Sequence, residues 1–190
     1  MQNNRGKHRL FWAIVCLAIA VAAVLGLLRF SKLSKLTSSN QPGLYHVLYF
    51  DDGDTLVVDM NGHPETVRFI GVDTPETHKP NVPVQCYGPE ASAYTKKLVG
   101  SQKVRLVADP LDTNRDRYGR LLRYIYLPDG RLVDQILITQ GYGLAYTFFP
   151  FSKKAEFTAD EQAARQAKHG LWSKCQVVID KIGRHTNPAE

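Results

Sequence analysis

Two acidic segments carry the clearest chemical signal in the sequence. The first is D-G-D-T at residues 52–55, and the second is D-T-P-E at residues 73–76. Carboxylates that gather in one place repel one another unless a cation lies among them, and carboxylate and carbonyl oxygens suit hard ions such as Ca²⁺ and Mg²⁺. No Cys and His residues have the spacing of a zinc site. If the two segments approach each other in the fold, they predict a site for a divalent cation.

Arginine residues lie near these acids and at one further place in the chain. Arg68 precedes the second acidic segment, and Arg117 and Arg120 flank a Tyr-Gly pair in the segment D-R-Y-G-R at residues 116–120. A guanidinium group is a planar fork that matches phosphate oxygens and stays charged. A hard cation, arginines and a free carboxylate are the groups that phosphodiester hydrolysis needs. Each segment alone is equally typical of a charged surface turn, so the function depends on whether the segments meet.

Four blocks of the sequence together resemble the staphylococcal (micrococcal) nuclease family, often called thermonucleases. The blocks are D-G-D-T, V-R-F-I-G-V-D-T-P-E, Y-G-P-E-A-S-A-Y-T-K-K-L-V and D-R-Y-G-R-L-L-R-Y-I-Y, and the likeness runs from about Tyr45 to Trp172. The resemblance implies a Ca²⁺-dependent nuclease that hydrolyses phosphodiester bonds of DNA and RNA with little sequence preference. It also implies attack at the P–O5′ bond, which leaves 3′-phosphates.

The resemblance assigns a metal site and a carboxylate that acts on water. One Ca²⁺ ion is expected to bind carboxylate oxygens of Asp54 and Asp73 and the backbone carbonyl of Thr74. Asp52 is a nearby acid that does not bind the ion directly. Glu76 matches the carboxylate that positions or deprotonates the attacking water, and the sequence leaves both roles open.

The resemblance also assigns the residues that hold the substrate. Arg68 and Arg120 match the arginines that bind the phosphate, and they take the role that a second ion plays in two-metal nucleases. Arg117 and Tyr118 match residues that grip a terminal phosphate. Tyr146 is expected beneath a base, where stacking contributes roughly 1–3 kcal/mol per base and suits single strands. We expect DNA and RNA, preferably single-stranded, as substrates of a monomer without an obligate protein partner.

The elements that must position these residues are five strands and three helices. Apolar runs bounded by turn residues predict the strands, and Asn61-Gly62 predicts a hairpin turn between the second strand and the third. Proline and glycine residues mark the starts and ends of the helices. The pattern matches an α+β fold, a five-stranded OB-type β-barrel with three helices, which the resemblance also implies. The expected strands are 45–50, 55–60, a third ending at Val72, 103–109 and 121–127, and the expected helices are 89–99, 133–140 and 154–168.

The N-terminal part of the chain reads as a membrane segment. Residues 10–28 are uncharged and largely apolar and follow a basic cluster, which predicts one N-terminal transmembrane helix. We expect residues 1–36 to be an uncleaved signal anchor and 37–44 a linker, with the domain at 45–175 and a tail at 176–190. A signal peptide cleaved after Ala20-Val21-Ala22 is the alternative. The domain is then extracytoplasmic, in the periplasm or at the cell surface, or secreted if the segment is cleaved.

The net positive charge of the chain comes from its N-terminal segment and not from the predicted domain. Six of the 24 Lys and Arg residues lie in residues 1–36, which hold no acidic residue, so the remaining 18 balance the 18 Asp and Glu. Bulk basicity therefore gives no argument for nucleic-acid binding, and a membrane-held receptor for polyanions is disfavoured. A catalytically inactive, membrane-tethered OB-type module that binds nucleic acid remains the alternative to an enzyme. The acidic and basic site residues together favour the enzyme, because a pure binding module does not need them.

Three cysteines are present, and Cys16 lies in the apolar N-terminal segment. Cys86 and Cys175 remain for the domain, either as two free thiols or as one disulfide. If the domain is exported, we expect the disulfide.

Overall fold

The computed structural model describes residues 43–79, 82–180 and 183–189. The predicted transmembrane helix at 10–28 and most of the predicted linker lie outside the described residues. Within the described part, no helix is long and apolar enough to cross a bilayer.

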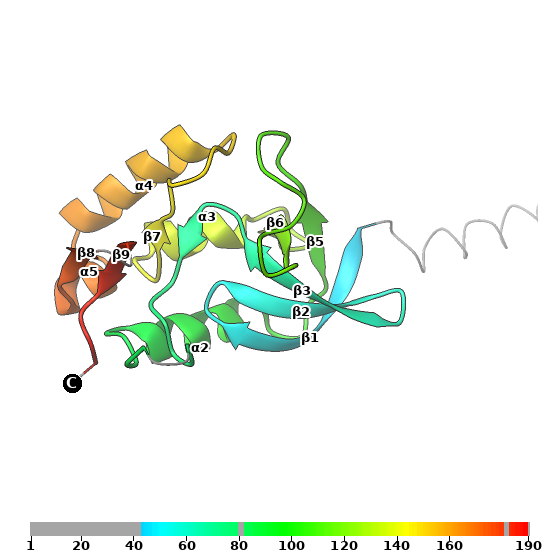
Figure 1. Cartoon of the computed structure of the whole chain (residues 1–190), viewed down its shortest axis with the longest axis horizontal. Coiled ribbons are helices and arrows are strands. Elements are labelled where there is room, and N and C mark those ends of the chain that lie inside the picture. The colour runs from blue at the N-terminus through cyan, green and yellow to red at the C-terminus, as the bar shows by residue number, and fades with distance from the viewer. Residues whose placement is uncertain (1–42, 80–81, 181–182, 190) are drawn as a thin grey trace, which may run out of the picture. The chain divides into compact units, whose positions relative to one another are not determined.

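Five strands form a closed β-barrel in the order β1-β2-β3-β6-β5 (Figure 1). Strands β3 and β6 pair in parallel, and the other neighbours are antiparallel. Together with three main helices, this barrel confirms the expected α+β fold of OB type. The barrel strands are β1 (Leu44–Asp52), β2 (Thr55–Met60), β3 (His63–Phe69), β5 (Val104–Val107) and β6 (Leu121–Tyr126).

The turn between β2 and β3 follows the sequence prediction. Asn61 and Gly62 both have positive φ angles, 58° and 87°, as a tight two-residue hairpin requires. The Asp59 carboxylate accepts a hydrogen bond from the Gly62 N–H. This turn fixes the register in which Thr55 of β2 pairs with Arg68 of β3, and that pairing brings the first acidic segment beside Arg68.

The third strand ends earlier than the sequence predicts. It stops at Phe69 rather than at Val72, because the chain turns at Gly71, which has a φ of 73°. A side chain at Gly71 would lie within 2.6 Å of the Phe151 ring, so only glycine fits. Beyond this turn, β4 (Val72–Asp73) pairs with β7 (Leu144–Ala145) in a separate two-stranded sheet. The break therefore redirects the second acidic segment.

The three expected helices are present with small differences at their ends. α2 is Gly88–Val99, α3 is Val133–Thr139 and α4 is Lys154–Gln166. Their buried side chains, such as Val99, Leu137 and Phe157, join the barrel core formed by Leu56, Val67, Ile125 and their neighbours. Each fully buried side chain of this size contributes roughly 1.5–3 kcal/mol. The core thus holds the strand that carries Arg68.

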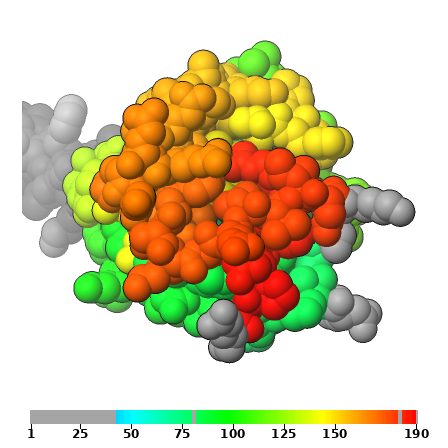
Figure 2. Space-filling model, turned by 90° about the vertical axis from the view of Figure 1, so that its left-hand side faces the viewer, coloured from blue at the N-terminus to red at the C-terminus, as the bar shows by residue number. Residues whose placement is uncertain are grey.

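The predicted tail at 176–190 contains two strands, and a short helix precedes it. A short helix α5 (Leu171–Lys174) precedes two antiparallel strands, β8 (Val177–Asp180) and β9 (Gly183–Thr186). In Figure 1, α4, α5, β8 and β9 lie at the end of the domain opposite the β2–β3 turn. Figure 2 shows the same segments, in orange and red, side by side across one face.

Candidate active site

Arg68 joins the two acidic segments. Its Nη1 lies 2.7 Å from Oδ2 of Asp54, and its Nη2 lies 2.5 Å from Oδ1 of Asp73. Nη1 also donates to the Val72 carbonyl at 2.9 Å. The segments that the sequence places far apart therefore meet around one guanidinium group.

Thr74, in the second acidic segment, also contacts the first acidic segment. Its backbone N–H donates to Asp54 Oδ2 at 2.7 Å, and its own Oγ1 is buried with no hydrogen-bond partner in the described structure. A side chain at Gly53 would lie within 2.7 Å of this hydroxyl, which explains the glycine in the first segment. The Thr95 hydroxyl on α2 holds the same turn by donating to the Gly53 carbonyl at 2.6 Å. Sequence analysis missed Thr95, since nothing marks it in its helix.

The acidic side chains differ in their environments. Asp52 accepts hydrogen bonds from the Gly53 N–H and the Thr77 hydroxyl, while burial and the nearby Asp54 raise its pKa to about 6. Burial also raises the pKa of Asp73 to about 6, although the Arg68 guanidinium opposes the shift. Burial is the main cause of both raised pKa values, and repulsion from neighbouring carboxylates adds to it.

Glu76 lies on the loop that follows β4. Its backbone N–H donates to Oε1 of Gln85 at 3.0 Å, and its carboxylate lies 3.4 Å from Nζ of Lys79. The carboxylate is 31% exposed, so water reaches it. Sequence analysis did not single out Gln85, because its contact crosses a loop that carries no local signal.

The carboxylate oxygens of Asp54 and Asp73 are chemically suited to a hard cation, although both carboxylates form ion pairs with Arg68. Among residues 43–79, 82–180 and 183–189, no three His, Cys, Asp or Glu side chains are grouped closely enough to hold a metal ion. Asp54 and Asp73 nevertheless converge on one positive group, and Asp52 adds charge beside them. Carboxylate oxygens are the type of ligand that Ca²⁺ prefers, so these side chains suit a hard cation by their chemistry.

The arginine turn forms a second cluster. The guanidinium groups of Arg117 and Arg120 lie over the exposed Tyr118 ring, 4.8 Å and 5.4 Å from its centroid. Arg120 forms its ion pair with Asp116 at 2.7 Å. The structure therefore gathers Arg117, Tyr118 and Arg120. In the part of the chain that it describes, it shows no ion pair between Arg120 and Asp54 or Asp73.

Tyr146 begins an exposed aromatic group. Its N–H donates to the Gly71 carbonyl at 2.8 Å, which places it beside the turn that leads to Asp73. Its ring lies 6.5 Å from Phe148 and 6.0 Å from Phe149, and all three side chains are exposed. This group offers apolar faces next to the acidic site.

The two domain cysteines are joined. Cys86 and Cys175 form a disulfide with an S–S distance of 2.01 Å, so the alternative of two free thiols does not apply to this structure.

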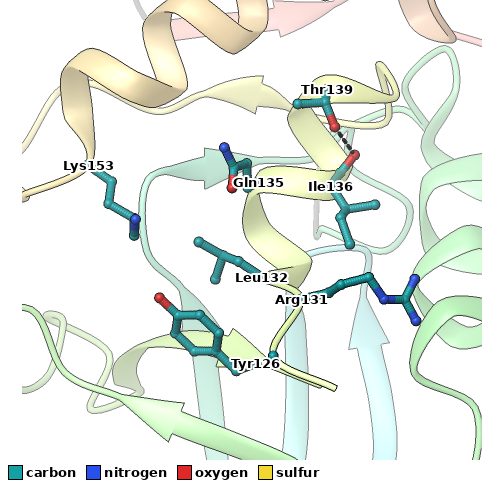
Figure 3. A pocket seen from close by; sticks show the side chains of 8 residues that line it. Tyr126, Arg131, Leu132, Gln135, Ile136, Thr139 and Lys153 are labelled. Atoms are coloured by element: carbon teal, nitrogen blue, oxygen red, sulfur yellow. Dashed lines mark hydrogen bonds between the residues drawn. The ribbon is translucent and has the colours of Figure 1, made fainter. Parts of the chain in front are cut away.

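A surface cavity of about 410 Å³ lies elsewhere, between the end of β6, α3 and the start of α4. Lys153 and Arg131 approach it from opposite sides (Figure 3). Both cations are already paired, with Glu156 and Asp129 respectively. The cavity is not lined by any residue of the acidic site.

Comparisons with known proteins identify relatives of this chain. Residues 66–174 match a family model described as staphylococcal nuclease homologue. Over 132 residues the chain is 46% identical to two proteins of Bacillus subtilis (strain 168), endonuclease YncB and the SPbeta prophage-derived endonuclease YokF. The matched region covers 68% of this chain, 62% of YncB and 44% of YokF. It is 43% identical over 145 residues to the thermonuclease of Staphylococcus hyicus, covering 75% of this chain and 82% of that protein. The chain thus spans less than two thirds of the length of either Bacillus protein.

Proposed function

The chain belongs to the family of staphylococcal nuclease homologues, and on this premise we propose that it is a hydrolytic nuclease that cleaves phosphodiester bonds of DNA and RNA with Ca²⁺ as cofactor. The observation that carries the proposal is the convergence of Asp54 and Asp73 on Arg68. It unites carboxylates that suit a hard cation with a guanidinium that suits phosphate. The similarity to proteins named endonuclease and thermonuclease supports the same activity.

Asp54, Asp73 and the Thr74 carbonyl would hold one Ca²⁺ ion, with Asp52 adding negative charge beside them. When bound, the ion would offset the negative charge that develops on the phosphate in the transition state. Arg68 reaches both carboxylates, and its fork is equally suited to two phosphate oxygens.

Glu76 would position or deprotonate the attacking water. Its carboxylate is partly exposed, and its ion pair with Lys79 is long at 3.4 Å, so it is accessible as a proton acceptor. Arg120 would stabilise the charged phosphate after turning from its present partner Asp116. Arg117 and Tyr118 would bind a terminal phosphate beside the cleaved one.

Single-stranded substrates suit the exposed aromatic group best. Tyr146 would stack on a base, and Phe148 and Phe149 extend the apolar surface beside it. Stacking does not depend on base identity, which fits cleavage with little sequence preference. The proposal includes attack at the P–O5′ bond with release of 3′-phosphates, and action as a monomer without an obligate protein partner.

The proposal also places the domain outside the cytoplasm, held by the apolar segment 10–28 or released if that segment is cleaved. The Cys86–Cys175 disulfide supports this location, because such bonds persist mainly in oxidising compartments. Protease accessibility of the domain in intact cells, together with the mature N-terminus, tests this part.

The activity is tested with the full-length chain and a labelled single-stranded oligonucleotide. We expect cleavage in millimolar Ca²⁺ and none with a chelator. Glu76→Gln and Arg120→Ala should each lower the rate by about 10²-fold or more, while the matched controls Glu90→Gln and Arg165→Ala retain it. Full activity in chelator would overturn the metal assignment, and full activity in both site variants would overturn the mechanism. Binding without cleavage would establish the inactive binding module instead.

A further inference from the structure

The C-terminal segment, residues 183–189 including β9, is bonded to the short loop 84–86 that precedes α2. The Cys86 N–H donates to the Asn187 carbonyl at 2.7 Å, and the Thr186 hydroxyl donates to the Cys86 carbonyl at 2.8 Å. The Ala189 N–H donates to the Val84 carbonyl at 2.8 Å. The disulfide between Cys86 and Cys175 adds a covalent link to the same loop. Four independent connections therefore fix the position of this loop.

Gln85, at the centre of the loop, is bonded to both backbone groups of Glu76. Its side-chain Oε1 accepts the Glu76 N–H at 3.0 Å, and its own N–H donates to the Glu76 carbonyl at 2.9 Å. Gln85 is only 8% exposed, and it pairs with Pro188 of the C-terminal segment in an isolated β-bridge. The chain of contacts thus runs from the C-terminal segment through Gln85 to Glu76.

The C-terminal segment also has a contact that leads to β4. Arg184 of β9 forms an ion pair with the Glu161 carboxylate on α4. Glu161 accepts the Ala145 N–H of β7 at 3.2 Å, and β7 pairs with β4, which carries Asp73. One segment is therefore linked both to Glu76, through Gln85, and to β4, through Glu161 and β7.

We propose that Gln85 is a positioning residue for Glu76, and that the C-terminal segment and the Cys86–Cys175 disulfide hold Gln85 in place. The inference rests on the proposed function and assigns it residues outside the metal and phosphate groups. The match to the family model ends at residue 174, so Cys175 and the C-terminal segment lie beyond the region it covers. A carboxylate that acts on water must be held within about 0.5 Å of its productive position, and a misplacement of about 1 Å can cost 10²-fold in rate.

The first test compares Gln85→Leu with Gln85→Glu in the full-length chain. Leucine removes the acceptor for the Glu76 N–H, whereas glutamate keeps an acceptor oxygen at the same distance from the backbone. With a single-stranded oligonucleotide in saturating Ca²⁺, we expect kcat of Gln85→Leu to fall by about 10-fold or more at an unchanged KM. Gln85→Glu should restore most of kcat. A folded Gln85→Leu protein with the kcat of the natural chain would overturn the role of Gln85.

Hydrogen exchange at the Glu76 amide gives a readout that does not require activity. We expect exchange to be about 10-fold faster or more in Gln85→Leu, because the amide loses its acceptor. Unchanged protection would overturn the proposal even if the protein cleaves DNA. A natural chain that cleaves no nucleic acid would overturn the proposed function, while faster exchange in the variant would still establish the contact.

The second test removes the hydrogen bond from Thr186 and, in a separate variant, the disulfide to Cys175. Thr186→Val deletes the hydroxyl bound to Cys86, and Cys86→Ser with Cys175→Ser deletes the disulfide. We expect both to lower kcat and to weaken protection of the Glu76 amide, by less than Gln85→Leu. The matched control is Thr158→Val, which deletes a threonine hydroxyl bonded only within α4 and should change neither. Full kcat and full protection in Thr186→Val would overturn the part assigned to the C-terminal segment, and the same result in the double cysteine variant would overturn the part assigned to the disulfide.

Discussion

Arg68 and Asp54 form an ion pair at 2.7 Å in which both side chains are largely withdrawn from water, with 13% and 8% of their surfaces exposed. The same guanidinium also holds Asp73. A residue expected to bind phosphate thus neutralises two residues expected to bind the metal. Because removal of one partner leaves a buried charge uncompensated, this pair dominates the electrostatics of the site.

We expect Arg68→Ala to lower the free energy of unfolding by about 3–5 kcal/mol in chelator, because Asp54 then stays buried without a cation. Added Ca²⁺ should recover part of this loss by supplying the missing charge. Urea unfolding with and without Ca²⁺ measures both effects. The matched control is Arg115→Ala, whose partner Glu65 lies nearer the surface and whose loss should cost much less, because exposed ion pairs contribute little to stability. Equal losses in the two variants would contradict the prediction.

Calcium affinity should depend on pH, because Asp52 and Asp73 have pKa values of about 6. Below pH 6 Asp73 binds a proton that Ca²⁺ must displace, and a protonated Asp52 no longer adds negative charge beside the ion, so the affinity should rise as pH increases from 5 to 7. Each group that must lose its proton contributes up to about 10-fold over this range. Calorimetric titration at pH 5, 6 and 7 tests the prediction. Asp52→Asn should weaken the pH dependence, and a constant affinity would speak against competition by protons.

Thr95→Val should destabilise the turn that carries the first acidic segment. The buried hydroxyl is the group that holds the Gly53 carbonyl, and loss of such a partner costs about 1–3 kcal/mol. Because Gly53 lies between Asp52 and Asp54, Ca²⁺ affinity should fall together with stability. Thr139→Val is the control, since its hydroxyl bonds within its own helix. An affinity that equals that of the natural chain would show that the turn keeps its shape without Thr95.

Asp134 should make stability depend on pH. Its carboxyl is fully buried, with Oδ2 accepting the Ile125 N–H at 2.9 Å, and burial raises its pKa from 3.8 to about 8. The folded state therefore keeps a proton that the unfolded state has already lost. The stabilisation is complete below pH 4 and is lost as pH rises through 8, by up to about 1.4 kcal/mol per pH unit.

Asp134→Asn should remove this dependence, because an amide does not titrate in this range. Unfolding free energies of both proteins between pH 6 and 8 give the difference directly. Asp51→Asn, at an exposed position, is the control for loss of a carboxylate. A natural chain and an Asp134→Asn variant with parallel pH profiles would contradict the prediction.

Local pattern was enough to predict most elements of the fold. Apolar alternation marked the barrel strands, and Asn61-Gly62 marked the hairpin, because both signals depend on neighbours in sequence. Proline and glycine residues at helix ends marked the three main helices. The residue types of the acidic and arginine segments likewise indicated their chemistry before any geometry was known.

Tertiary structure decided where the third strand ends and which residues meet. The strand ends at Phe69 because Gly71 packs against Phe151, a residue far along the chain. Arg120 forms an ion pair with Asp116, whereas Arg68 forms ion pairs with both acidic residues that are expected to bind the metal.

The sequence by itself thus determined the barrel, the helices and the kinds of group in the site, since these follow from periodicity and side-chain chemistry. Only the tertiary structure decided that Gln85 holds Glu76, that Thr95 holds Gly53, and that the C-terminal strands β8 and β9 pair with each other. The physical reason is that each of these contacts depends on how the chain packs in three dimensions, and the local sequence pattern around a residue carries no information about its partner.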